Sequence, residues 1–318
     1  MIWKALFSVL GLLSLGSILY SFGFEKLYFD IASLGWWSLP LALSFIPVAL
    51  CYTLAWQLTL PELPPSRFPR LFRYMLASIA WNNLSPFVKV LGEPVRVVML
   101  EQLVSRKTAI KSVVLYNLVH TLGTLLAFLV GTFIILFHFP VSAPIRIGFV
   151  SLIFVFSALF LLAYFLPRLR VGGRKKPAQK NMLWKIGFGI RWGLAKIHVF
   201  SQVHPWRFWL AVFVETLARF VEGFTFYIAF RALGEPISLF YCALLDVGRA
   251  LMDNVFFFIP YQVGSREASL LLLCKNVLRM GADSAVSVAV LYRLVEILWM
   301  ALGYLLWMKG TKPSRVST

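Results

Sequence analysis

Long apolar runs separated by short polar segments dominate the hydropathy pattern of the chain. A helix needs about 20 mostly apolar residues to cross a bilayer. On that basis we predict six membrane-spanning helices, over residues 2–22, 36–59, 112–138, 147–166, 208–230 and 284–307. The first run follows Lys4 as a signal peptide would, but it lacks a clear small-x-small cleavage site, so we expect an anchor helix. The pattern predicts an all-α polytopic membrane protein with one integral membrane domain, residues 1–318.

Two further apolar runs are interrupted by polar residues. Residues 74–91 read YMLASIAWNNLSPFVKVL, and residues 241–264 read YCALLDVGRALMDNVFFFIPYQVG. In each run a proline and then a glycine follow the polar residues. Backbone groups freed by such breaks cannot face lipid, so they must be buried in protein or line a wet cavity. We therefore predict two re-entrant or broken helices.

Basic residues gather in some of the loops and predict the orientation of the chain. They occur at Arg67, Arg70 and Arg73, over residues 168–180, and at Lys309, Lys312 and Arg315. Segments 23–35 and 139–145 carry almost none. Because lysine and arginine mark cytoplasmic loops, both termini are predicted to be cytoplasmic. Each interrupted run would then return to the side from which it entered.

The two halves of the chain repeat one pattern. A span, a polar pair, a proline and a glycine precede VLYNLV at 114–119, and the same order precedes VLYRLV at 290–295. With the orientation above, this predicts an inverted-topology repeat of residues 36–138 and 206–309, as in many transporters. Residues 167–206 would be a basic cytoplasmic linker with an interfacial helix. The alternative for the repeat is a duplication kept only for packing. The alternative for the interfacial helix is a poorly amphipathic connector.

Composition supports the membrane assignment and narrows the chemistry. Hydrophobic residues make up 60% of the chain and charged residues 14%, and the mean hydropathy is +0.80, whereas soluble domains carry about 25% charged residues. Cytoplasmic loops explain the net charge of +18 better than a nucleic-acid partner does. The three cysteines have no pairing or metal spacing, and no Walker loop occurs. We expect no cofactor and no metal.

Ionisable residues inside the predicted spans are costly and are functional by default. Several share one helix face: Glu215, Arg219 and Glu222; Asp246, Arg249 and Asp253; and Arg293 and Glu296. Asn117 and His120 hold the positions in the third span that match Arg293 and Glu296. These residues predict a polar track through the membrane. The alternative is a set of ion pairs with a purely structural role. Glu215 can pair with Arg219 within one helix, and Arg249 lies between two aspartates.

The two breaks combine a proline, a glycine, an acid and a base. They read SPFVKVLGEPVR at 85–96 and IPYQVGSREASL at 259–270. The helix that follows offers free N–H groups suited to a phosphate, and arginine adds bidentate contacts. Glu93 and Glu267 also fit ordinary capping of a helix start. The predicted substrate-binding residues are Asn82, Asn83, Pro86, Gly92, Glu93, Arg96, Asp253, Asn254, Pro260, Gly264, Arg266 and Glu267.

The break sequences carry a family resemblance over roughly residues 30–310. NNLSPFVKVLGEPVRVVML and FIPYQVGSREASLLLL, each followed by its VLYxLV helix, resemble the transmembrane region of lysylphosphatidylglycerol synthases and the flippase-like proteins built on it. GWWSLPLALSFIPVALCYTLAWQLTLP at 35–61 looks most like hopanoid-biosynthesis-associated membrane proteins. The chain departs from the family pattern at Leu91, where a second glycine is usual, and at Arg266, where a small or apolar residue is usual.

The resemblance implies translocation of a lipid and not its synthesis, because the soluble aminoacyl-transfer domain of the synthases does not follow the last span. We expect a bacterial inner-membrane protein, not an enzyme, that moves a lipid with an anionic or polyol headgroup without ATP. Lipid-biosynthesis or envelope proteins are its expected partners. The alternatives are a membrane transferase acting on a lipid carrier, a small-anion transporter, or an accessory subunit of a lipid-biosynthesis complex.

Overall fold

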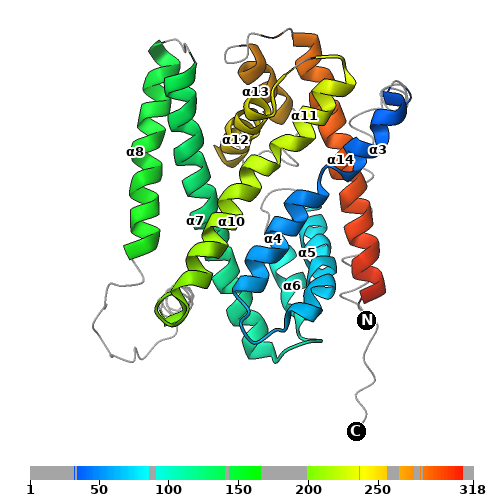
Figure 1. Cartoon of the computed structure of the whole chain (residues 1–318), viewed down its shortest axis with the longest axis vertical. Coiled ribbons are helices and arrows are strands. Elements are labelled where there is room, and N and C mark those ends of the chain that lie inside the picture. The colour runs from blue at the N-terminus through cyan, green and yellow to red at the C-terminus, as the bar shows by residue number, and fades with distance from the viewer. Residues whose placement is uncertain are drawn as a thin grey trace, which may run out of the picture.

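The computed structural model describes residues 34–85, 91–139, 143–165, 199–235, 237–255, 265–275 and 282–310, together with residues 32 and 280. These ranges are almost entirely helical and contain no strand, which confirms the all-α prediction for them (Figure 1). The helices are η1 Gly35–Trp37, α3 Ser38–Leu43, α4 Ile46–Leu58, η2 Pro65–Arg67, α5 Phe68–Asn83, α6 Gly92–Leu100, α7 Arg106–His138, α8 Ala143–Phe165, α10 Pro205–Val221, α11 Gly223–Ala232, α12 Leu239–Val255, α13 Ser265–Leu273 and α14 Ala282–Gly310.

Local sequence explains where several helices begin and end. Helices α4, α5 and α10 carry a proline in their first turn, where the missing N–H would have no intrahelical partner. The Ser105 side chain caps α7 by accepting a hydrogen bond from the Thr108 backbone N–H at 3.3 Å. Gly234, with a φ of +80°, follows the end of α11 in the left-handed region that favours glycine.

Three stretches of the described residues are long and apolar enough to cross a membrane, namely Gly35–Leu58, Arg106–His138 and Ser284–Gly310. They contain the predicted spans at 36–59, 112–138 and 284–307, although Ser44 and Phe45 interrupt the first one between α3 and α4. The predicted span at 147–166 falls on α8, which holds a shorter apolar helix, Arg146–Leu159. The span at 208–230 is divided into α10 and α11. The span at 2–22 lies outside the described residues, so the count of six stays a prediction.

Each interrupted run contains one helix, and a second helix begins directly after the run. Helix α5 of the first run packs on α6, and α12 of the second run packs on α13. Helix α5 ends at Asn83 and α6 begins at Gly92, whereas α12 ends at Val255 and α13 begins at Ser265. The segments between the members of each pair, with Pro86, Pro260 and Gly264, lie outside the described residues. The first run is broken within the described residues, because Leu84 and Ser85 leave the helix. The break in the second run and the return of each run to its side of entry stay predictions.

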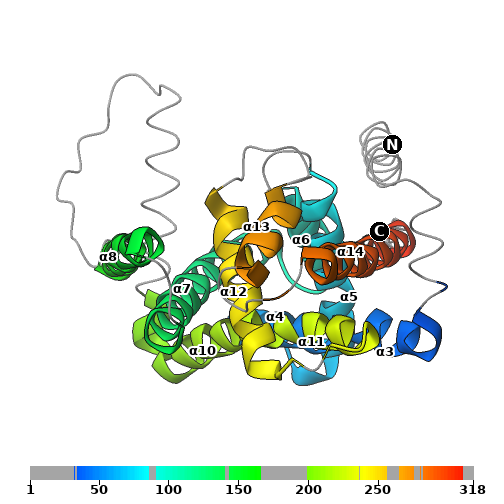
Figure 2. The same ribbon diagram turned by 90° about the horizontal axis from the view of Figure 1, so that it is seen from above.

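The two helix pairs lie at opposite ends of the molecule. Figure 1 shows α5 and α6 in the lower half and α12 and α13 in the upper half, with α7 and α14 on either side of them. Seen from above, α10, α4, α11 and α3 form a row along one side (Figure 2). Packing between the halves is crosswise, because α5 contacts α14 and α12 contacts α7. The space between the pairs thus draws its lining from both halves of the chain.

Small residues bring these crosswise partners together. A Cβ atom on Gly303 of α14 would lie 2.4 Å from the Leu76 carbonyl oxygen of α5. A Cβ atom on Gly131 of α7 would lie 2.5 Å from a methyl carbon of Val247 on α12. Close approach through glycine is a common means of helix association in membranes. Large apolar side chains such as Phe137 and Phe154 remain exposed on the outside, as expected of a surface that faces lipid.

Candidate functional site

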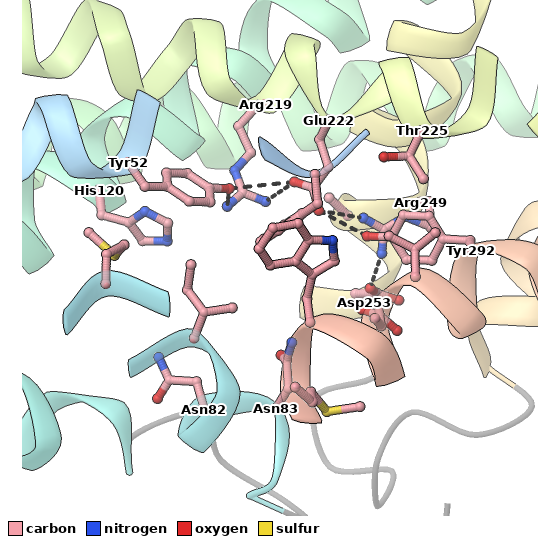
Figure 3. A pocket seen from close by; sticks show the side chains of 18 of the residues that line it. Tyr52, Asn82, Asn83, His120, Arg219, Glu222, Thr225, Arg249, Asp253 and Tyr292 are labelled. Carbon is pink, nitrogen blue, oxygen red and sulfur yellow. Dashed lines mark hydrogen bonds and ion pairs between the residues drawn. The ribbon is translucent and has the colours of Figure 1, made fainter. Parts of the chain in front are cut away.

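A cavity of about 170 Å³ lies between the two helix pairs and is lined by polar and charged side chains (Figure 3). The ionisable residues that line it are His120, Arg96, Arg219, Arg249, Arg266, Glu222, Asp253 and Glu296. They come from helices α6, α7, α10, α12, α13 and α14, and Glu222 lies at the junction of α10 with α11. A concentration of charge inside an apolar helical protein is expensive, so it requires an explanation in pairing or in function.

Arg249 is the centre of an ion-pair network. Its guanidinium lies 2.6 Å from an oxygen of Asp246, 2.6 Å from Asp253 and 3.6 Å from Glu222. Glu222 in turn accepts a hydrogen bond of 3.2 Å from Arg219. Arg249 and Asp246 are 3% and 0% exposed, so these charges are held almost entirely by one another.

The network continues into the last two helices. Arg266 Nε lies 2.8 Å from Asp253, and its Nη1 lies 2.5 Å from Glu296. Glu296 also binds Arg293, at 3.0 Å. Among the described residues, the ion-pair network joins Arg219, Arg249, Arg266, Arg293, Glu222, Asp246, Asp253 and Glu296. Four cations thus face four anions, and the network is neutral when all are ionised.

Buried tyrosines frame the arginines of the cavity. The Arg249 guanidinium lies 4.7 Å from the ring centroid of Tyr292, and the Arg96 guanidinium lies 4.6 Å from that of Tyr116. The Tyr292 hydroxyl also donates to Glu222 at 2.9 Å, and Arg219 donates to the hydroxyl of Tyr52. Cation–π contacts of this kind strengthen when they are desolvated. Each VLYxLV motif therefore supplies one tyrosine whose ring packs against one arginine.

Arg96 is bound differently from the other cavity arginines. Its Nε donates to the Ser78 hydroxyl at 2.6 Å, and its Nη1 donates to the Asn117 side-chain oxygen at 3.3 Å. The Trp56 ring centroid lies 5.7 Å away. Arg96 is 6% exposed and forms no ion pair with any carboxylate among the described residues.

The start of α6 is joined to the end of α5 at the edge of the cavity. The Gly92 N–H donates to the Asn82 side-chain oxygen at 2.7 Å, and the Ser78 hydroxyl donates to the Gly92 carbonyl at 3.1 Å. A Cβ atom on Gly92 would lie 2.3 Å from the Ser78 carbonyl oxygen. The glycine is therefore required by the close approach of the two helices.

The family of the chain follows from a comparison with known sequences. The family model of the lysylphosphatidylglycerol synthase transmembrane region matches residues 1–303. The chain belongs to this family. Membership confirms the resemblance seen in the break sequences and indicates a membrane protein of lipid metabolism. No curated protein and no solved structure matches the chain. The association with hopanoid biosynthesis stays a prediction.

In this member of the lysylphosphatidylglycerol synthase transmembrane family, many of the sequence-predicted site residues meet at the cavity. Those that line it are Asn82, Asn83, Arg96, Arg219, Glu222, Arg249, Asp253, Asn254, Arg266 and Glu296. Figure 3 shows Asn82 and Asn83 across the cavity from Arg219 and Glu222. Segments far apart in the sequence thus supply one site.

The remaining predicted residues lie elsewhere. Gly92 and Glu93 do not line the cavity, and Asp246 and Arg293 stand behind it in the network. The pair of Glu215 with Arg219, which was the alternative for these residues, does not form, because Glu215 binds His120 at 2.9 Å and Arg219 binds Glu222. Helix α10 packs on α7, and this contact between helices brings the His120 ring to Glu215. Of Glu267 only the backbone, in α13, is described.

Some functional residues of this transmembrane-family site were not predicted. Tyr116 and Tyr292 carried a signal, since they are the repeated tyrosine of the VLYxLV motifs. Tyr52, Trp56 and Ser78 carried none, because an isolated polar or aromatic residue in an apolar run reads as ordinary core.

Within the described residues, no group of three or more His, Cys, Asp or Glu side chains could hold a metal ion.

Proposed function

We propose that this protein moves a polar-headed lipid between the leaflets of a bacterial inner membrane. The observation that carries the proposal is the charged cavity between the two helix pairs. A headgroup that crosses the apolar interior loses its hydration, so it needs polar partners along the way. Arginines, carboxylates and the amides of Asn82 and Asn83 offer such partners, while the acyl chains remain in lipid.

The arrangement of the helices supports alternating access to this cavity. The pairs α5–α6 and α12–α13 hold corresponding places in the repeats proposed over residues 36–138 and 206–309. Each pair also packs on the long helix of the other repeat, since α5 contacts α14 and α12 contacts α7. In inverted repeats, rocking of one half against the other opens a midplane site to each side in turn. We place both termini in the cytoplasm on the basis of the basic loops.

The proposed transport uses no ATP and involves no chemical change of the lipid. A gradient, the membrane potential or consumption of the lipid on the far side would set the direction. Proteins of lipid biosynthesis or of the cell envelope would supply or remove the lipid. The protein is thus proposed as a transporter and not as an enzyme.

Reconstitution into vesicles tests the proposal. The purified protein is placed in phosphatidylcholine vesicles that contain trace head-labelled phosphatidylglycerol, and loss of the label to an impermeant quencher reports movement between leaflets. We expect faster movement than in protein-free vesicles and recovery of the lipid with unchanged mass. Arg219→Met should slow movement per folded molecule because Arg219 lines the cavity. Arg106→Gln should not, because the Arg106 side chain is 79% exposed at the start of α7.

Two results would contradict the proposal. The first is lipid movement that is no faster with folded protein than in protein-free vesicles, both for phosphatidylglycerol and for an uncharged glycolipid. That result would exclude the transport function. A lipid recovered with altered mass would favour the transferase alternative.

A further inference from the structure

The charges around the cavity are divided unequally between its two sides. The ion-pair network balances four cations with four anions. Within the described part of the chain, Arg96, on the opposite side in α6, is bound only by neutral groups, namely Ser78, Asn117 and the rings of Tyr116 and Trp56. A buried cation is normally paired with an anion. Arg96 is therefore the cavity-lining cation that lacks an anionic partner among the described residues.

We propose that Arg96 is the binding site for a phosphate group of the lipid that the protein moves. This inference rests on the proposed function and adds the residue of this chain that recognises the phosphate of the lipid. Arg266, the other arginine of the break sequences, is not the counterpart of Arg96 in this role. Asp253 and Glu296 already occupy its guanidinium.

The hydrogen bonds of Arg96 leave it equipped for an anion. A guanidinium has five N–H donors in a planar fork. The bonds to Ser78 and Asn117 use two of them, one on Nε and one on Nη1, which leaves three on Nη1 and Nη2. Two adjacent terminal donors match two oxygens of a phosphate. The neutral partners also fix the guanidinium in position, so little orientational freedom is lost on binding.

The proposed repeat explains why no carboxylate of the described residues neutralises Arg96. Glu296, which pairs with Arg266, follows the second VLYxLV motif, and His120 holds the matching position after the first. His120 binds Glu215, and neither side chain forms an ion pair with Arg96. Asn117 likewise stands where the second repeat has Arg293, and it offers Arg96 a neutral oxygen. The first repeat thus has an arginine, Arg96, but no acid at the position where the second repeat has Glu296.

The size of the cavity fits a headgroup. Its volume of about 170 Å³ lies below the range of about 300 to 1,000 Å³ that is common for pockets that hold drug-sized ligands. A phosphate and a small polar substituent fit this volume, and acyl chains do not. The amides of Asn82 and Asn83 line the same space and offer donors and acceptors to the substituent.

Direct binding measurements on the full chain in a phosphate-free maltoside detergent test the inference without transport. The probes are dihexanoyl phosphatidylglycerol, phosphate-free dihexanoylglycerol and inorganic phosphate, followed by isothermal titration calorimetry. We expect the phospholipid to bind at least about tenfold more tightly than dihexanoylglycerol, because hydrogen bonds to charged groups are the strong ones. Arg96→Gln should remove that preference, and Arg106→Gln, an exposed arginine, should preserve it.

Asn117→Asp is the sharper variant, because it leaves Arg96 in place. The new carboxylate would lie about where the Asn117 oxygen lies, 3.3 Å from Nη1, and would neutralise the guanidinium. It should abolish the preference for the phospholipid while the protein stays folded and monodisperse. A preference that survives in this variant overturns the inference, even if Arg96→Gln fails to fold.

The remaining outcomes identify the source of the phosphate and separate the two proposals. Binding of both phosphate probes, or of the phospholipid alone, supports the inference. Binding of inorganic phosphate alone overturns its lipid part and favours a small-anion transporter. Binding that depends on Arg96, combined with no lipid movement in vesicles, removes the proposed function and keeps the phosphate site. Lipid movement with no effect of Arg96→Gln or Asn117→Asp removes the phosphate site only.

Discussion

Arg249 is the residue whose surroundings most constrain the site. It contacts Asp246, Asp253 and Glu222 and stacks on Tyr292, and it is 3% exposed. Removal of one partner from a buried ion pair leaves the others charged in a medium of low dielectric constant. The network is therefore more sensitive to the loss of one member than an exposed pair is.

We expect Arg249→Met to destabilise the protein by about 3 to 5 kcal/mol, since Asp246 and Asp253 would both lose their shortest ion pair. Thermal unfolding in detergent, followed by intrinsic fluorescence, measures the change. Adding Asp246→Asn should recover part of the loss, because it removes one of the stranded charges. Arg106→Gln, which breaks the exposed pair with Glu101, should cost about 1 kcal/mol or less. Equal losses of stability in Arg249→Met and Arg106→Gln would mean that water reaches the network and screens its charges, which contradicts the prediction.

Tyr292→Phe separates the hydrogen bond of this tyrosine from its ring contact. The variant loses the 2.9 Å bond to Glu222 but keeps the ring beside Arg249. We expect a loss of about 1.5 to 3 kcal/mol, the range for hydrogen bonds to charged groups. Tyr227→Phe is the matched control, because the Tyr227 ring contacts Arg231 and its hydroxyl has no hydrogen bond to a described residue. A control that unfolds at the same lowered temperature would refute this assignment.

At the scale of elements, the helix pair α5–α6 depends on the absence of a side chain at Gly92. The two helices approach so closely that a Cβ atom there would overlap the Ser78 carbonyl, and the Gly92 N–H is bound by Asn82. Because α6 also carries Arg96, any separation of the pair would move this arginine in the cavity.

Gly92→Ala should therefore destabilise the protein by about 1 to 3 kcal/mol, as overpacking of a tight contact does. It should also weaken phosphatidylglycerol binding. Gly148→Ala in α8 is the control, because a Cβ atom there meets nothing within 4 Å and alanine favours a helix. The two melting temperatures are compared in the same detergent. A Gly92→Ala protein as stable as Gly148→Ala would show that α5 and α6 can move apart freely.

The sequence predicts the helices better than it predicts the contacts between them. The length of the apolar runs located α7 and α14, and the spacing of Asp246, Arg249 and Asp253 along one helix made their pairing one of two alternatives. The partners of Arg266 and Glu215 could not be predicted, because they lie on other helices and depend on how those helices pack. Residues of one helix meet by spacing alone, whereas residues of different helices meet only through tertiary packing.

At the scale of the whole molecule, the two ends carry the loops that define orientation. The turn from α6 to α7 lies at the lower end of Figure 1, and the turn from α11 to α12 lies at the upper end. The basic loops predict that the lower end is cytoplasmic. Cysteine accessibility can decide the point, because the native thiols of Cys242 and Cys274 are fully buried.

We expect opposite labelling of Glu101→Cys and Ser238→Cys in a background without Cys51, Cys242 and Cys274. Both positions are exposed. In intact cells an impermeant maleimide should label the cysteine at position 238, and in inverted membrane vesicles it should label the cysteine at position 101. Reaction of both from the same side would refute the proposed inverted repeat, and an exchange of sides would reverse the assigned orientation.

Crosswise packing also has a consequence for synthesis of the chain. Helix α5 is complete at residue 83, but α14, on which it packs, begins at residue 282. During translation the contact surface of α5 therefore stays without its packing partner until the last helix has left the ribosome. A chain that stalls before residue 282 would keep this surface uncovered in the membrane. We expect a chain truncated after residue 281 to be degraded faster than the full chain in a pulse-chase experiment, so that only completed molecules accumulate.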